Sequence, residues 1–309
     1  MSWWQLWKQT QQRRLGRKRD KKEEQGFIQQ WFLLAAQTPL ESCLQPTPAQ
    51  MTPIYPPNNT FWADPFIWSH NNKYYIFFED FPFATWRGHI SVISLDANLQ
   101  PEGEAIPVLQ EPYHLSYPFL FEYEGNLYMI PEKTEVNRID LYRCVEFPHR
   151  WEFVHTLMDG IKAADSTLLE HDGKWWLLCA AKQGRVRINE SLFVFMADSP
   201  LSQKWQAHPR NPVLRDLAKG RPAGRIFQAY GSLWRPSQDC VRRYGYGLNL
   251  NKIESLTPCL YQESNHYYVN SNWEIGVRAN HHLDWHKGLM VMDAQRLLAK
   301  DIVGDIKLA

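Results

Sequence analysis

The sequence predicts an all-β protein, a five-bladed β-propeller that follows a short, charged and helical N-terminal extension. Its 309 residues include 14 tryptophans, 14 tyrosines and 15 phenylalanines, and aromatic side chains favour strands. From residue 60 onward, short runs of alternating apolar residues end at Gly, Asn, Asp or Pro about every 8–12 residues, which is typical of sandwiches and propellers. An internal repeat favours the propeller.

The repeat consists of a strand, a tight turn and a second strand, and it occurs four times. The four copies cover residues 63–80, 117–133, 166–182 and 223–239. Their turns, marked by Asn72, Gly125, Gly173 and Gly231, are 53, 48 and 58 residues apart. A period of about 50 residues matches one propeller blade, so residues 60–309 divide into five blades. We expect the fifth blade to use residues 281–294 and to be closed by chain from the other end of the sequence.

The first 59 residues differ in composition from the rest. Residues 1–38 form the charged extension, with a short amphipathic helix expected over residues 26–36. Residues 39–59 form a connector whose six prolines exclude regular structure. The basic cluster of the extension comprises Arg13, Arg14, Arg17, Lys18 and Arg19. It indicates either an anionic partner, such as a membrane surface or RNA, or a terminus that is simply solvated.

Composition excludes several classes of protein. The 34 Lys and Arg nearly balance the 33 Asp and Glu, for a net charge of +1, so nucleic acid is not an expected partner. The longest apolar run, residues 31–36, is far shorter than the roughly 18 residues of a membrane span, and the opening residues do not resemble a signal peptide. Five cysteines without a CxxC pair argue against zinc and disulfides. We therefore expect a cytoplasmic protein without a transmembrane segment.

No motif for a cofactor or a metal ion stands out. The sequence has no glycine-rich phosphate loop and no GxSxG elbow, so no cofactor is expected. His281 and His282 are adjacent and should face opposite sides of a strand, and no HxH or HxxxH spacing lies near carboxylates. A metal site is therefore not expected either. His114, which stands alone before an apolar run, is a candidate for substrate binding.

Equivalent positions of the repeats should meet around the central channel. A first level, at the start of the inner strand, holds Asp64, Tyr117 and the Asp165–Ser166 pair. A second level, at the end of the next strand, holds Glu79, Glu132, Ala180 and Gln238. Two carboxylates across a narrow channel meet the requirement for acid–base chemistry on an acetal. Asp64 precedes Pro65, so it also fits a simple turn cap.

Aromatic and basic residues accompany these acids. Trp62, Phe66, Tyr117 and Trp234 suit the apolar face of a sugar ring, although each also fits the core between blades. Arg221, Arg225 and Arg235 cluster in the fourth repeat, and arginine binds carboxylate or phosphate through two N–H groups. These arginines indicate an anionic ligand, or else they pair with acids on neighbouring blades.

Several segments together resemble a known family. They are FWADPFIW (61–68), HLSYPFLFEYEGNLYMIPE (114–132), AADSTLLEHDGKWWLL (163–178), RPAGRIF (221–227) and LWRPSQDC (233–240). Over about residues 57–295 the sequence resembles the N-terminal domain of glucosamine inositolphosphorylceramide transferases. The resemblance implies a fold close to the five-bladed propeller glycosidases of the arabinanase and xylosidase type. It also implies that the plant transferases carry their glycosyltransferase chemistry on a separate C-terminal domain, which has no counterpart in this sequence.

The resemblance also implies roles for individual residues. In the related glycosidases a base lies in the first blade, a pKa-modulating Asp in the third and an acid Glu in the fourth. Asp64 matches the base and Asp165 matches the modulator. The fourth blade offers Arg221 and Arg225 where the Glu is expected. Glu132, or less favourably Glu79, is therefore expected to replace it.

The leading hypothesis is a carbohydrate-active propeller that hydrolyses or transfers at a glycosidic bond of an anionic or phosphorylated glycan. Asp64 would be the general base, Glu132 the acid and Asp165 the orienting residue. Substrate contacts are expected from Glu79, His114, Tyr117, Arg221, Arg225, Arg235 and Gln238. One alternative is a non-catalytic glycan-binding module that accompanies a glycosyltransferase in surface-polysaccharide or glycolipid synthesis. Another is a protein-interaction propeller, which would need an exposed apolar patch.

Overall fold

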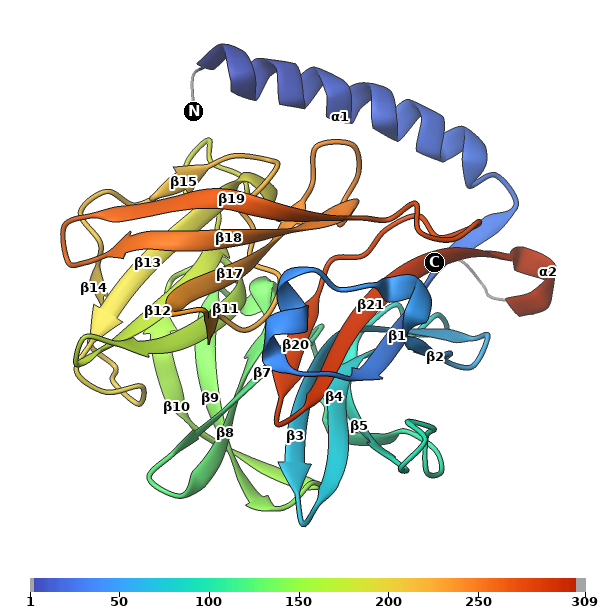
Figure 1. Ribbon diagram of the computed structural model, residues 1–309, viewed down its shortest axis with the longest axis horizontal. Coiled ribbons are helices and arrows are strands. Elements are labelled where there is room, and N and C mark those ends of the chain that lie inside the picture. Colours follow the sequence, from blue (N-terminus) through green and yellow to red (C-terminus); the bar gives the residue numbers. More distant parts are fainter. Residues whose placement is uncertain (1–2, 304–309) are drawn as a thin grey trace.

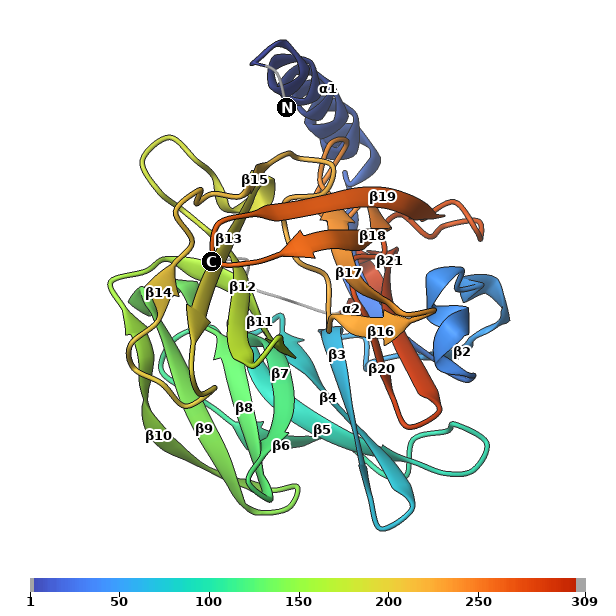
Figure 2. The same cartoon turned by 60° about the vertical axis from the view of Figure 1, so that its left-hand side comes forward.

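The computed structural model describes residues 3–303 and shows a ring of five antiparallel sheets around one axis (Figure 1, Figure 2). The predicted all-β, five-bladed propeller is therefore confirmed. The outermost residues of the predicted ranges, 1–2 and 304–309, lie outside the described residues.

The first four blades follow one another along the chain. Blade one consists of β3 (Thr60–His70), β4 (Lys73–Pro82), β5 (His89–Leu95) and β6 (Ile106–Leu109). Blade two consists of β7 (Ser116–Tyr123), β8 (Asn126–Glu132), β9 (Arg138–Glu146) and β10 (Arg150–Asp159). Blade three consists of β11 (Ala163–His171), β12 (Lys174–Ala181), β13 (Ser191–Ala197), β14 (Gln206–Ala207) and β15 (Leu214–Arg215). Blade four consists of β16 (Phe227–Ala229), β17 (Ser232–Asp239), β18 (Gly247–Leu256) and β19 (Tyr261–Asn270).

Blade five joins the two ends of the chain. Its strands are β20 (Leu283–His286), β21 (Leu289–Ala299), β1 (Phe27–Gln37) and β2 (Thr52–Ile54). β1 pairs with β21 along its whole length, in antiparallel register. Chain from the other end of the sequence thus closes the ring, as the repeat analysis expected.

The predicted helix over residues 26–36 was wrong, because this segment is strand β1. Leu33, Leu34 and Ala35 are all buried, so both faces of the strand are covered. A run that is apolar on both faces lacks the alternation that separates a strand from a buried helix in a sequence. The propeller therefore begins at residue 27 rather than at residue 60. The proline-rich connector also holds regular structure, since it contains β2 and two 3-10 turns, Leu40–Leu44 and Pro48–Gln50.

Each blade turns from its first to its second strand through the same two-residue geometry. The turn residues all have positive φ and are Asn71–Asn72, Glu124–Gly125, Asp172–Gly173, Tyr230–Gly231 and Lys287–Gly288. Two successive left-handed residues give the twist that joins the strands of a tight hairpin. The first four are the predicted turn markers, and the fifth shows that the same unit recurs in blade five.

Helix α1 (Trp3–Glu23) lies along one face of the ring (Figure 1). It packs on loops of blades three to five: Gln9 donates to Asp216 Oδ1, and Asp20 pairs with Arg243 at 2.6 Å. Gly16 allows this approach, because a Cβ there would lie 2.2 Å from the backbone oxygen of Arg242. The remaining helices are the short η3 (Thr134–Val136), η4 (Ile188–Glu190) and α2 (Lys300–Val303). Within residues 3–303, no helix combines the length and the apolar character that crossing a lipid bilayer requires.

The approach of blade four to blade five depends on Gly224, and we expect Gly224→Ala to destabilise the protein strongly. The residue has φ +128°, and a Cβ would lie 1.9 Å from the backbone oxygen of Leu283. The backbone would have to move, at a cost of about 3 kcal/mol or more. Gly103→Ala is the matched control, because Gly103 also has positive φ (+87°) but has nothing within 4 Å of its Cβ position. Denaturant unfolding of both variants checks this, and equal losses would contradict it.

Candidate functional site

Three blades carry the same irregularity at the start of the inner strand. The ladders between first and second strands shift register between Ala63 and Phe66, Ser116 and Phe119, and Ala164 and Thr167. The residues inside these bulges include Asp64, Tyr117 and Asp165, each with φ near +50°. A bulge redirects a side chain. The repeated bulge therefore brings the first-level residues to one height around the axis.

The second-level residues lie across the ladder from these bulges. Glu79 pairs with Ala63, and Glu132 pairs with Ser116. In blade four the backbone N–H of Gln238 donates to the backbone oxygen of Arg221. The two levels predicted from the repeats thus lie next to each other in the structure.

Asp165 is held by Arg221 and Gln238. Arg221 donates from Nε to Asp165 Oδ2 at 2.5 Å and from Nη2 to Asp165 Oδ1 at 3.1 Å. Gln238 Nε2 donates to the same Asp165 Oδ2 at 3.2 Å. Glu132 Oε2 accepts from the backbone N–H of Asp165 at 3.3 Å and lies 3.5 Å from Arg221 Nη2. Residues from blades two, three and four therefore meet in one cluster.

Asp64 faces two histidines and a further aspartate of blade five. Its Oδ1 lies 3.7 Å from His281 Nε2 and 3.6 Å from His282 Nδ1. Asp293 Oδ2 lies 2.6 Å from His281 Nδ1 and accepts from the backbone N–H of Asp64. In the described part of the chain Asp64 Oδ1 is buried and accepts no hydrogen bond. This oxygen is free to take a proton.

The sequence-based view that His281 and His282 face opposite ways was wrong. The chain between Ala279, which bridges to Gln295, and Leu283, which pairs with Met292, contains an extra residue. This bulge turns both histidines toward Asp64, and both backbone N–H groups donate to Asp293 Oδ1. The regular alternation of a strand does not apply there.

One group in the described residues has the geometry of a metal site, which the sequence analysis did not expect. Ligand atoms of Asp64, His281 and Asp293 lie within 4.8 Å of one another. The oxygens of Asp293 already accept three backbone N–H groups and face His281 Nδ1. Asp293 is therefore better suited to orient His281 than to bind a cation.

Burial raises the pKa values of three acids in this site. It raises the pKa of Asp64 to about 7, although His281 opposes the change. Burial, reinforced by the neighbouring carboxyls, raises the pKa of Glu79 and of Glu132 well above the usual range. Burial alone would lower the pKa of His281, but Asp293 raises it. Burial therefore favours the protonated form of Glu132, while Asp64 changes its protonation near neutral pH.

A family model described as the N-terminal part of glucosamine inositolphosphorylceramide transferase 1 matches residues 36–306. The chain belongs to this family. Glucosamine inositolphosphorylceramide transferase 1 of Oryza sativa subsp. japonica is 39% identical over 230 residues, which are 73% of this chain and 30% of that protein. The Arabidopsis thaliana protein is 36% identical over 213 residues, 67% of this chain and 27% of that protein. The chain thus spans less than a third of the length of these relatives.

Solved glycosidase structures share the fold of this family member. A family 43 β-1,3-galactosidase with galactodeoxynojirimycin aligns with a TM-score of 0.52 at 15% identity, over 78% of this chain and 90% of that chain. The catalytic domain of a family 62 α-L-arabinofuranosidase from Coprinopsis cinerea aligns with a TM-score of 0.55 at 11% identity, over 76% and 90% of the two chains. At these identities the similarity shows the five-bladed propeller.

Two of the predicted substrate-binding arginines make structural ion pairs. Arg235 is 1% exposed, and its Nε and Nη2 both donate to Glu263 within blade four. Arg225 donates to Asp284 of the neighbouring blade at 2.9 Å and to the backbone oxygen of Leu120. The guanidinium of Arg235 is thus enclosed, in line with the interpretation that these arginines pair with acids. Arg225 pairs with an acid of a neighbouring blade, which is the second interpretation that the sequence offered for these arginines.

The aromatic residues proposed for a sugar face belong mostly to the core. Trp62 packs on Phe78, and Trp234 donates to the backbone oxygen of Ala229 in the core of blade four. Phe66 is fully buried between blades one and two. These three rings follow the second interpretation, core packing between blades, because propeller blades pack against each other through such rings.

Tyr117 and His114 hold neighbouring parts of the cluster in place. The Tyr117 hydroxyl lies 2.8 Å from Thr167 Oγ1 and accepts from the backbone N–H of Gly224 at 2.9 Å. This links blade two to blades three and four. His114 Nε2 lies 3.4 Å from Glu79 Oε1, and its Nδ1 accepts from the backbone N–H of Gly88. His114 thus stands beside the second-level acid of blade one.

Tyr244 completes the cluster and was not found from the sequence. The guanidinium carbon of Arg221 lies 5.0 Å from the centre of its ring, and His281 meets the same ring edge-on at 5.1 Å. On its other side His281 stacks on Trp31 of β1 at 4.0 Å. No repeat pattern marks Tyr244, because it lies in the loop between β17 and β18. The turn at Lys287–Gly288 was a signal for this part of blade five, because Asn280 stands eight residues before Gly288, as Asp64 stands before Asn72, and His281 follows it directly.

Proposed function

We propose that this family member is a carbohydrate-active propeller that hydrolyses or transfers at a glycosidic bond of an anionic glycan. The observation that supports this most strongly is the pair Asp64 and Glu132. These carboxyls belong to adjacent blades, and burial raises the pKa of both. Buried carboxyls with raised pKa values are typical of acid–base chemistry at a glycosidic bond.

Glu132 would act as the general acid. Burial raises its pKa and so favours the protonated form, and the backbone N–H of Asp165 donates to one of its oxygens. It would donate its proton to the glycosidic oxygen as the bond to the sugar breaks. Asp64 would accept a proton from the attacking water or hydroxyl, because its Oδ1 accepts no hydrogen bond from the described residues. His281, oriented by Asp293, would stabilise the ionised form of Asp64.

Arg221 supports the preference for an anionic substrate. Its Nη1 donates to the neutral amide oxygen of Asn189 at 2.8 Å, whereas its Nε and Nη2 form ion pairs with Asp165 and Glu132. A carboxylate or phosphate oxygen of the glycan would replace the Asn189 contact with a charge-assisted bond.

A non-catalytic glycan-binding module beside a glycosyltransferase is the second candidate. It is supported by Arg221, which occupies the blade where the related glycosidases are expected to place their acid, and by the enclosure of the cluster. Asp64 is 4% exposed and Asp165 is fully buried. A partner activity would fit the plant relatives, of which this chain spans less than a third.

Binding and turnover, measured on the same glycans, separate the two candidates. The probes are oligosaccharides that carry uronic acids or phosphate, with calorimetry for binding and chromatography for product. We expect product from the wild type and at least a 100-fold lower rate from Glu132→Gln. Glu122→Gln is the control, because Glu122 is an exposed acid on the same blade. Binding without product would support the second candidate, and neither binding nor product would contradict both.

A further inference from the structure

A pocket of about 380 Å³ lies between α1 and the propeller, and its volume is within the range of small-molecule sites. Its lining includes three cations of α1, Arg13, Arg17 and Lys21, here called the basic row. Tyr244 and Gln295 of the propeller also line it. Figure 1 shows α1 lying along this face of the ring, so the pocket is formed where the helix meets the blades.

Tyr244 connects this pocket to the acids of the channel. The guanidinium carbon of Arg221, which donates to Asp165, lies 5.0 Å from the centre of the Tyr244 ring. Burial raises the pKa of the Tyr244 hydroxyl, Arg221 lowers it, and the charges of the channel acids raise it further. Tyr244 also lies in the loop after β17, the strand that carries the second-level residue Gln238. The pocket therefore lies on the same face of the ring as the acids.

Arg13 is buried, at 8% exposed, and has no partner. Among residues 3–303 it makes neither a hydrogen bond nor an ion pair. Its Nε is closed off, whereas its terminal nitrogens remain accessible beside the pocket. Burial lowers the pKa of Arg13, and neighbouring cations, among them Arg17 and Arg221, lower it further. A buried guanidinium without an acceptor is costly, and an oxyanion is its best acceptor.

Arg17 and Lys21 continue the basic row along the helix. Residues four apart lie on one face of a helix, with Cβ atoms about 5–6 Å apart, so Arg13 and Arg17 can contact a single oxyanion together. Arg17 and Lys21 are exposed, and in the part of the chain that the structure describes neither pairs with an acid. Like charges at this spacing destabilise a helix. A bound anion would remove their repulsion.

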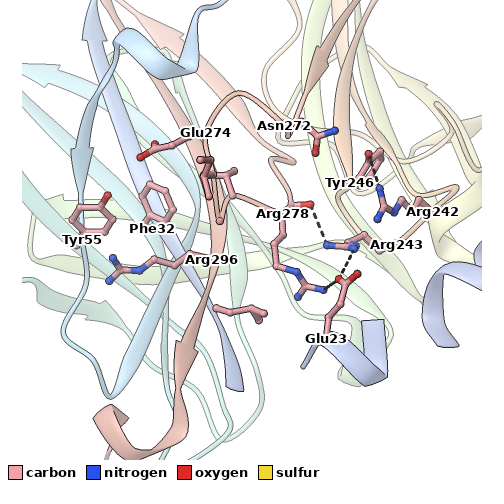
Figure 3. Close-up of a pocket in the computed structure, with 14 residues that line it drawn as sticks. Glu23, Phe32, Tyr55, Arg242, Arg243, Tyr246, Asn272, Glu274, Arg278 and Arg296 are labelled. Carbon is pink, nitrogen blue, oxygen red and sulfur yellow. Dashed lines mark hydrogen bonds and ion pairs between the residues drawn. The ribbon is translucent and has the colours of Figure 1, made fainter. Parts of the chain in front are cut away.

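The acids of α1 near the pocket already have other partners. Asp20 pairs with Arg243 at 2.6 Å, and Glu24 pairs with Arg278 at 3.0 Å. Glu23 pairs with both arginines, at 3.5 and 3.3 Å, as Figure 3 shows. These ion pairs attach the end of α1 to the propeller. Together with the basic row, five cations face three acids here, so an excess of two positive charges remains.

We propose that Arg13 and Arg17 bind the anionic group, a carboxylate or a phosphate, of a glycan that reaches the channel acids, an assignment that rests on the proposed function. The oxygens of this group accept from the terminal nitrogens of Arg13 and from Arg17, and Lys21 adds positive charge. Because Tyr244 stands between the pocket and the acids, the group belongs to a part of the glycan apart from the bond that reacts. Helix α1 is then part of the substrate site.

Calorimetry at low salt with glucuronic acid, glucose 1-phosphate and glucose measures binding at this site without any turnover. We expect both acids to bind and glucose not to bind, because only the acids carry an oxyanion. Arg13→Met should weaken their binding about 10- to 100-fold, the effect of one charge-assisted hydrogen bond. Arg17→Gln, at an exposed position, should weaken it about 2- to 5-fold. The acid that binds more tightly identifies the group, carboxylate or phosphate, that the site prefers.

Arg14→Gln is the matched control. Arg14 is the exposed neighbour of Arg13 and does not line the pocket, so this variant loses the same charge and should keep its binding. Arg13→Lys keeps the charge without the planar donors and should bind with intermediate affinity. Thermal unfolding of Arg13→Met should show no lower midpoint, because no ion pair is lost. Glucose 1-phosphate should raise the midpoint of the wild type but not that of Arg13→Met.

Turnover separates this proposal from the proposed function. On a glycan that the wild type converts, Arg13→Met should raise KM and leave kcat largely unchanged, because the anionic group lies apart from the bond that reacts. Binding of the acids without turnover of any glycan would contradict the proposed function and leave the oxyanion site standing. Turnover with a wild-type KM in Arg13→Met would contradict this site alone. The proposal is also overturned if neither acid binds, or if Arg13→Met binds both as tightly as the wild type.

Discussion

Asp64→Asn should lower turnover of a glycan substrate about 10²- to 10⁴-fold while leaving the fold intact. This range is the usual contribution of a positioned acid or base. The asparagine side chain keeps the size of the aspartate, and asparagine tolerates the left-handed conformation that residue 64 adopts, with φ 53°. It cannot accept a proton from the attacking group. The expected result is therefore a kinetic loss without a structural one, measured as kcat/KM beside a thermal unfolding curve.

The pH profile of the wild type gives the same assignment a second test. The base must be ionised, so kcat/KM should rise with pH through about 7, where Asp64 loses its proton. The rate should fall once Glu132 ionises, and its raised pKa keeps it protonated to a higher pH than an ordinary glutamate. In Asp64→Asn the rising limb near pH 7 should disappear, whereas Asp159→Asn, at an exposed position, should keep it. A rising limb that persists in Asp64→Asn would rule out Asp64 as the base.

Arg221→Met should lower the free energy of unfolding by about 3–5 kcal/mol, because it leaves a buried charge without its partner. Asp165 is fully buried and receives two hydrogen bonds from Arg221. Gln238 remains as a donor to Asp165, but it carries no charge. Methionine fills much of the volume of the arginine side chain, so the loss reports the charge rather than a cavity.

The double variant Arg221→Met with Asp165→Asn provides the control for this prediction. With both charges removed, no buried ion is left unpaired, and the loss should be much smaller than that of Arg221→Met alone. Urea unfolding of the two single variants and the double variant gives the coupling energy. Additive losses would show that Arg221 and Asp165 do not act as a buried pair.

The repeat in the sequence predicted more than the number of blades. Asp64, Tyr117 and Asp165 stand at the same distance before their turns, and Glu79 and Glu132 at the same distance after them. Strands that pair through identical turns have identical registers, so equal spacing along the chain becomes equal height on the axis. This is why residues about 50 positions apart were correctly placed at two adjacent levels.

Other parts of the site follow from contacts that no periodic pattern records. His281 and His282 both reach Asp64 because the strand bulges there. Arg235 is enclosed because Glu263 lies beside it. Tyr244 covers Arg221 from a loop. In each case the position depends on which atoms fill the space between neighbouring blades.

The fold of residues 26–36 could not be predicted from the sequence either, since the segment expected to be a helix is strand β1. Its apolar residues are buried on both faces, so its periodicity does not distinguish the first strand of a ring from a packed helix. Pairing with β21 makes the segment a strand, because all eleven residues from Phe27 to Gln37 pair with residues of β21. Those partners lie more than 250 residues away along the chain.

The order of residues alone therefore determined the five blades, the turns between their strands and the two levels of acids around the axis. Only the folded ring decided which arginine joins those acids, which histidines face Asp64 and which strand closes the circle. The spacing of residues within a repeat can be read from one stretch of chain. Burial, ion pairing and the closure of the ring depend on atoms that come into contact only after the chain has folded.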